Sequence, residues 1–217
     1  MKYPTAVAQF EEALREYTGA KFAVATQRCL SALTLCCLYL KVREVTIPDR
    51  IYNGVYNAMV SIGVHVHLER RYWVGSFDLH PYPIWDCAHK FEKGMYIPGQ
   101  FQCLSFGGGK ILSVGGAGGA ILHDDPAADS FFRRRRFDGR TEGIPPHLDD
   151  DIVIAPTNGP LFPAEAARLH TQLWYLNQKT NDRPIANYPD LTRLMNSTSL
   201  EPTTSFYIDK LKTSSGP

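Results

Sequence analysis

Three residues with reactive side chains lie close together in the middle of the sequence. Asp86 ends the short apolar segment "YPIWD", Ser105 ends "QCLS", and Lys110 lies in the loop that follows. We expect both segments to be strands. In open α/β sheets, ligands bind where the carboxyl ends of neighbouring strands meet. The sequence therefore predicts that a carboxylate, a hydroxyl and an amine share one edge of a sheet.

This set of side chains suits a phosphorylated aromatic aldehyde as cofactor. The amine of Lys110 can form a Schiff base with the aldehyde, and the carboxylate of Asp86 can keep a pyridine nitrogen protonated. The hydroxyl of Ser105 and backbone N–H groups can bind the phosphate. The glycine clusters on both sides of Lys110 also suggest a nucleotide-binding loop, but they precede an expected strand instead of opening a helix. We interpret them as close backbone packing around the lysine loop.

The segments that must position these residues alternate in type along the chain. Expected strands at "KFAVAT", "EVTIP", "VHVHLE", "YPIWD", "QFQCLSF" and "GGAILHD" are interspersed with helix-like segments up to residue 137. This alternation predicts an α/β fold, a three-layer sandwich with a mainly parallel sheet. We expect a large domain at 1–176 that includes an amphipathic helix beginning near Pro163, and a short C-terminal extension at 177–217.

The composition argues against several classes of partner. With a net charge of +1, the 217-residue chain lacks the basic excess typical of proteins that bind nucleic acid or anionic membranes. No apolar run reaches the roughly 20 residues that span a bilayer. The five cysteines include no CxxC pair, which favours buried free thiols over disulfides or zinc. His65 and His67 share a strand face but have no third ligand nearby, so no metal site is expected. We therefore expect a cytoplasmic protein with small-molecule partners, no nucleic acid and no membrane.

Longer motifs around the three reactive residues resemble a known family. The segments "WDCAH" (85–89), "GQFQCLSFGGGKILSVGGAGGAILHD" (99–124) and "FFRRRRFDGR" (131–140) are similar to the patterns "EDAAQ", "GDxGCFSFxxTKxLxxGxGGxxxT" and "RxHGR". These patterns are typical of the DegT/StrS-type sugar aminotransferases, which are fold-type I pyridoxal-phosphate enzymes. Weaker similarity runs from Phe10 to Leu176. The resemblance implies a reduced version of the fold-type I large domain, in a truncated member that lacks most of the C-terminal small domain.

The resemblance also implies a role for each matching residue. Lys110 would form the Schiff base with pyridoxal phosphate and carry protons, and Asp86 would pair with the pyridinium nitrogen; these two are the candidate catalytic residues. The other implied contacts are Ser105 with the cofactor phosphate, Tyr52 and His89 with the cofactor ring, and Asn158 with the phosphate held by the neighbouring subunit. The last contact implies a homodimer with shared active sites.

The sequence departs from the family pattern in two places near the expected site. The phosphate-binding turn "SSGT" is replaced by "QRCL" at 27–30, which puts Cys29 at the turn; Arg28 or Ser31 could take over its role, and we count Arg28 and Cys29 among the cofactor-binding candidates. The segment 70–81 is short where family members have a further helix–strand unit.

The function that the resemblance implies is that of a transferase. A pyridoxal-phosphate-dependent aminotransferase would move an amino group from glutamate or glutamine to a nucleotide-linked keto-sugar, and arginines near 133–140 would face this anionic substrate. The alternative is a degenerate, non-catalytic family member that binds pyridoxal phosphate or a sugar nucleotide. A third interpretation, an unrelated nucleotide-binding module, requires the matches in spacing to be coincidental.

Overall fold

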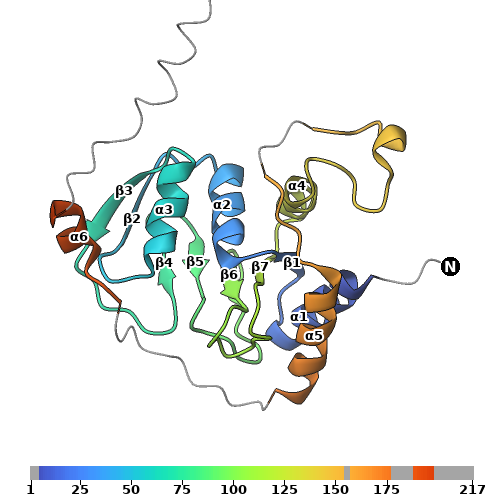
Figure 1. Cartoon of the computed structure of the whole chain (residues 1–217), viewed down its shortest axis with the longest axis horizontal. Helices are drawn as coiled ribbons and strands as arrows, with labels where there is room; N and C mark the ends of the chain where they lie inside the picture. The colour runs from blue at the N-terminus through green and yellow to red at the C-terminus, as the bar shows by residue number, and fades with distance from the viewer. Residues whose placement is uncertain (1–4, 154–156, 177–187, 198–217) are drawn as a thin grey trace, which may run out of the picture.

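The computed structural model describes residues 5–153, 157–176 and 188–197 (Figure 1). The helices are α1 (Ala6–Thr18), α2 (Cys29–Tyr39), α3 (Asn53–Ser61), α4 (Pro126–Arg136), α5 (Pro163–Tyr175) and α6 (Leu191–Ser197), with a 3-10 turn at Pro146–Leu148. The strands are β1 (Phe22–Thr26), β2 (Glu44–Pro48), β3 (His65–Glu69), β4 (Phe77–Asp78), β5 (Ile84–Asp86), β6 (Phe101–Ser105) and β7 (Gly119–His123). No helix within these described ranges has the length and apolar character needed to cross a bilayer.

Helices cover both faces of the central sheet and make three layers. Successive residues of a strand point to opposite faces. Accordingly, Val24 of β1 packs in one buried cluster with α2, α3 and α4, whereas Ala23 and Ala25 pack in a second cluster with α1 and α5. Figure 1 shows α1 and α5 side by side at one end of the sheet. The predicted α/β class and three-layer arrangement are confirmed.

The sheet itself is mixed, which corrects the expectation of a mainly parallel one. The five-stranded sheet has the order β1-β7-β6-β5-β4, and only the β5–β6 ladder within it is parallel. A separate parallel pair joins β2 and β3. Parallel neighbours require a long crossover, usually through a helix. The connection from β6 to β7 contains no helix, and the one from β4 to β5 is a short turn at 79–83, so both pairs run antiparallel.

The basic run at 133–136 belongs to a structural ion-pair network. The side chain of Glu11 on α1 is buried and accepts hydrogen bonds from the backbone N–H of Ala25 and from the guanidinium groups of Arg133 and Arg136. Arg136 is 2% exposed and also bonds Glu142. These contacts join α1, β1 and α4. The expectation that arginines near 133–140 face the substrate of the predicted site is not met, because none of them lines the main cavity described below.

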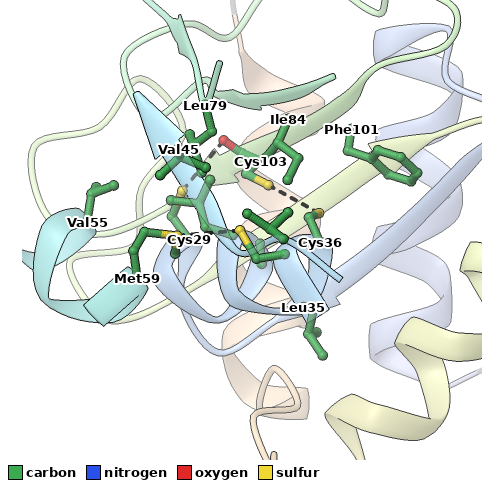
Figure 2. Packing of buried hydrophobic residues seen from close by; sticks show 14 of the residues in the cluster. Cys29, Leu35, Cys36, Val45, Val55, Met59, Leu79, Ile84, Phe101 and Cys103 are labelled. Carbon is green, nitrogen blue, oxygen red and sulfur yellow. Dashed lines mark hydrogen bonds between the residues drawn. The ribbon is translucent and has the colours of Figure 1, made fainter. Parts of the chain in front are cut away.

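All five cysteines are free and buried, as expected from their spacing. Three of them meet between α2 and β6, where the sulfurs of Cys36 and Cys103 lie 3.7 Å apart and the Cys29 thiol donates to the Cys103 carbonyl at 3.5 Å. Figure 2 shows these thiols surrounded by aliphatic side chains and Phe101. The thiols therefore act as small apolar groups that fill the core between helix and sheet.

A close backbone contact fixes the start of α2 against the start of β7. A Cβ atom on Gly119 would lie 2.4 Å from the carbonyl carbon of Arg28 and 2.5 Å from the nitrogen of Cys29. Both neighbours are backbone atoms of the first turn of a buried helix, so they cannot move aside cheaply. Only glycine allows β7 to approach the N-terminus of α2 this closely.

We expect Gly119→Ala to lower the free energy of unfolding by about 1–3 kcal/mol, the usual cost of overpacking a rigid site. Gly108→Ala is the matched control, because a Cβ there meets nothing within 4 Å; it should change stability by less than about 0.5 kcal/mol. Urea unfolding of both variants measures the difference. Equal stabilities would contradict the close contact.

Candidate functional site

A cavity of about 350 Å³ opens at the carboxyl ends of β5 and β6 and at the N-terminus of α2. Seven of the eight candidate residues from the sequence line it: Arg28, Cys29, Tyr52, Asp86, His89, Ser105 and Lys110. Cavities of a few hundred cubic ångströms with a small number of converging polar groups are typical of small-molecule sites. The fold thus brings together the carboxylate, hydroxyl and amine that the sequence predicted at one sheet edge.

Asp86 is a buried carboxylate at the floor of this cavity. It ends β5, is 5% exposed, and accepts a hydrogen bond from the backbone N–H of Ala88 at 2.8 Å. Burial raises the pKa of Asp86 from 3.8 to about 6, because the ionised form loses hydration; the Ala88 N–H and the charge of Lys110 oppose this shift only in part. A further cation or hydrogen-bond donor inside the cavity would therefore stabilise the ionised carboxylate.

Lys110 reaches the cavity from the glycine-rich loop between β6 and β7. Its Nζ atom lies 2.9 Å from Nε2 of His89, which follows β5. The same imidazole nitrogen lies 2.7 Å from the hydroxyl oxygen of Tyr188. The amine and the phenol therefore meet at one imidazole nitrogen, and we call this part of the cavity its reactive end.

The N-terminus of α2 presents backbone N–H groups to the cavity. Arg28 occupies the N-cap position, and its side chain makes no capping hydrogen bond. The first N–H groups of a helix and its dipole both favour a bound anion. Arg28 adds a positive charge, and Ser105 adds a hydroxyl from the end of β6. Burial raises the pKa of the Cys29 thiol beside them, so this group is a neutral wall of the site.

Tyr52 forms an exposed rim of the cavity. It is 54% exposed and precedes α3, and its ring lies over Gly54, where a Cβ atom would come within 2.4 Å of Tyr52 Cε1. The ring can thus face a ligand on one side while the backbone of α3 supports it on the other. This placement agrees with an aromatic contact to a bound ring, which stays a prediction.

Asn158 does not line the main cavity. It lies in a second cavity of about 290 Å³, together with Ser31, and its side-chain amide donates to Asp138 at 3.0 Å. Of the two residues considered as replacements for the altered phosphate turn, Arg28 therefore lines the main cavity and Ser31 does not. A contact of Asn158 with a ligand of a neighbouring subunit stays a prediction.

Besides Phe77, two aromatic residues of the cavity wall were missed from the sequence. Trp73, in the shortened segment 70–81, is 7% exposed and donates from Nε1 to the carbonyl of Arg50 at 3.0 Å. Tyr188 comes from the C-terminal segment and stacks against Trp73 with ring centroids 6.4 Å apart. Neither lies near a motif, and each reaches the site through tertiary packing, so no local signal identifies it.

Comparison with known proteins finds similarity to one family of aminotransferases. Residues 2–68 match the model of the DegT/DnrJ/EryC1/StrS aminotransferase family. This part of the chain is therefore similar to the DegT/DnrJ/EryC1/StrS aminotransferases. The resemblance inferred from the sequence is thereby confirmed, although the match covers the segment before the reactive residues. A search of curated proteins gave no significant match.

Solved structures of such aminotransferases share the fold. An aminotransferase from Psychrobacter cryohalolentis superposes with a TM-score of 0.65 at 17% identity, covering 78% of this chain and 56% of that one. The putative sugar aminotransferase Spr1654 from Streptococcus pneumoniae, in its PLP-form, gives 0.62 at 14% identity, covering 81% and 60%. DesV from S. venezuelae, in complex with a ketimine intermediate, gives 0.64 at 18%, covering 80% and 57%. The chain thus spans 56–60% of the length of these three relatives.

Burial of the Asp86 carboxylate lowers the stability of the ligand-free protein at neutral pH. Because the pKa of Asp86 is about 6 in the folded state and 3.8 as its ordinary value, folding disfavours its ionisation. The contribution of Asp86 to stability is therefore greatest below about pH 4, where its carboxyl is protonated in both the folded and the unfolded state. It falls by about 3 kcal/mol as the pH rises to about 6 and beyond.

We therefore expect Asp86→Asn to raise the free energy of unfolding by up to about 3 kcal/mol at pH 7.5, and by much less at pH 4. The asparagine oxygen can still accept from Ala88. Urea unfolding at the two pH values checks this, with the exposed Asp150→Asn as matched control, which should show no such gain. A gain that is equal at both pH values would contradict the assignment to ionisation.

Proposed function

We propose that this chain binds pyridoxal phosphate in the main cavity and transfers an amino group from glutamate or glutamine to a nucleotide-linked keto-sugar. One observation carries the proposal: a buried carboxylate, Asp86, an amine, Lys110, and the uncapped N-terminus of α2 converge on one cavity of about 350 Å³. The comparisons support it, because the Streptococcus pneumoniae relative is a putative sugar aminotransferase described in PLP- and PMP-forms.

The residues present fit the cofactor. A buried carboxylate is costly unless a positive group or hydrogen-bond donor compensates it, and a protonated pyridine nitrogen is such a donor for Asp86. The α2 N-terminus, Arg28 and Ser105 form a region suited to a phosphate. Tyr52 and His89 offer ring surfaces on the walls between these two ends. One end of the cavity, at Asp86, therefore suits the cofactor's ring nitrogen, and the other end, at the α2 N-terminus, suits its phosphate.

Lys110, His89 and Asp86 then have separate roles in the proposed reaction. When bound, pyridoxal phosphate supplies an aldehyde that condenses with amines and a ring that withdraws electrons from the attached carbon. Lys110 reacts as the neutral amine and can afterwards carry a proton at Nζ. His89, 2.9 Å away, orients this amine. Asp86 holds the positive charge of the ring in place, and the apolar surroundings of the carboxylate strengthen this interaction.

We also propose that the enzyme is a homodimer in the cytoplasm. Asn158 lies outside the main cavity, with its amide at a second cavity that includes Ser31. A residue of a shared site that serves the neighbouring subunit would occupy such a position. Free, buried thiols are typical of a reducing compartment, which favours the cytoplasm.

A second function is favoured by the altered phosphate turn. Cys29 contributes a buried thiol where the family motif has small residues and a hydroxyl, and three glycines precede Lys110 in the loop. In this alternative the chain binds pyridoxal phosphate or a sugar nucleotide without turnover. Both functions use the same cavity, so only a measurement of amino transfer distinguishes them.

We expect the purified protein to take up pyridoxal phosphate with a visible absorption band, and borohydride reduction to fix the label on Lys110. Lys110→Arg should abolish the label, because guanidinium does not form the Schiff base. Lys93→Arg changes an exposed lysine outside the cavity and should leave labelling intact. Peptide mass spectrometry locates the label.

The same sample separates the two candidate functions. Glutamate or glutamine that bleaches the band supports amino transfer. A labelled protein that neither donor bleaches supports binding without turnover. Absence of any label on Lys110 would refute the cofactor proposal in both forms.

A further inference from the structure

A tyrosine from the C-terminal segment reaches the reactive end of the cavity. The hydroxyl oxygen of Tyr188 lies 2.7 Å from Nε2 of His89, and the same nitrogen lies 2.9 Å from Nζ of Lys110. Tyr188 is half-buried, and its ring meets that of His89 edge to face at 5.7 Å. These contacts connect the reactive lysine, through one imidazole, to residues that follow α5 by more than ten positions.

The shared nitrogen limits how these groups can bond. A neutral imidazole nitrogen offers either one N–H or one lone pair, and a protonated one offers only N–H. Nε2 of His89 therefore makes one strong hydrogen bond at a time, either with Tyr188 or with Lys110. When the lysine amine moves toward a ligand, the phenol can take its place without rotation of the imidazole.

The segment that carries Tyr188 is anchored to the body of the fold. Asp190 caps α6 by accepting from the backbone N–H of Arg193 at 3.1 Å. Leu191 is 5% exposed, and its N–H donates to the carbonyl of Asp49 at 2.9 Å. The Tyr188 ring stacks against Trp73, which is itself hydrogen-bonded to the backbone of Arg50. The phenol is therefore held in position by the docked residues that follow it and by the Trp73 ring beside it.

We propose that Tyr188 is a positioning residue of this site. Its hydroxyl keeps the imidazole of His89 directed at Lys110 and serves as the alternative partner of Nε2 when the lysine amine turns away. Tyr188 thereby supplies part of the cavity wall and fixes the orientation of the His89 imidazole. The inference rests on the proposed function in one respect, because it takes Lys110 as the reactive amine.

The first test uses the ligand-free protein labelled with ¹⁵N-histidine. Tyr188→Phe keeps the ring that stacks on Trp73 and removes only the hydroxyl. We expect it to shift the Nε2 resonance of His89, since the hydrogen bond and tautomer balance at this nitrogen change. Tyr175→Phe makes the same chemical change at an exposed position on α5 and should leave the resonance unchanged. An unshifted resonance in Tyr188→Phe would overturn the inference.

A second variant tests the anchor without touching the cavity. Leu191→Ala weakens the packing of α6 on the core, so it should shift the same His89 resonance in the direction seen for Tyr188→Phe. A normal far-ultraviolet circular dichroism spectrum shows that the variant is folded. A His89 resonance identical to that of the wild type would contradict positioning by this segment.

Pyridoxal phosphate binding gives an independent readout. Loss of one hydrogen bond predicts that Tyr188→Phe still labels at Lys110 but binds the cofactor about two- to tenfold more weakly, with Tyr175→Phe unchanged. An unchanged affinity would count against the inference. If the wild type takes no label, the proposed function fails, whereas the His89 resonances of the ligand-free variants still decide the role of Tyr188.

Discussion

The parallel pairing of β5 with β6 is the constraint on which the site depends. In this pairing Asp86 lies opposite Cys103, so both strands end at the same edge of the sheet and Ser105 extends just beyond it. A hydrogen bond from the Cys87 N–H to the Cys103 carbonyl continues the pairing past the end of β5. The loops that follow the two strands then carry His89 and Lys110 to within 2.9 Å of each other. An antiparallel pairing would send the carboxylate and the amine to opposite ends of the sheet.

Two buried carboxylates in this fold show how structural and functional burial differ. Glu11 and Asp86 are both 5% exposed. Glu11 is surrounded by donors, with the guanidinium groups of Arg133 and Arg136 and the Ala25 N–H all bonded to it, so its charge is compensated within the chain and joins three elements. Asp86 accepts one backbone N–H and a weak thiol contact, and burial raises its pKa to about 6. A cavity beside an under-compensated carboxylate is the arrangement expected of a binding site, where the ligand supplies the missing partner.

Features that depend on neighbouring residues could be predicted from the sequence, and features that depend on distant contacts could not. Strand ends are set by short apolar runs, so the meeting of Asp86, Ser105 and Lys110 at one edge followed from the sequence. Strand direction is set by the connections, and the short turn at 79–83 and the helix-free loop before β7 reversed the expected polarity of two pairs. The arginine run on α4 was ambiguous because its partner, Glu11, lies more than 120 residues away. Contacts between distant segments depend on packing that no local pattern encodes.

The reactive end of the cavity combines a contact between neighbouring loops with a contact between distant segments, and the two depend on different parts of the fold. Lys110 and His89 are 21 positions apart on loops that leave adjacent paired strands, so their contact forms when the sheet edge forms. Tyr188 is 99 positions from His89 and reaches it only when Leu191 docks on the core. A short docked segment with few buried side chains opens at lower free energy than the sheet beneath it. The orientation of the imidazole therefore depends on the docking of α6, whereas the carboxylate, the amine and the α2 N-terminus are placed without it.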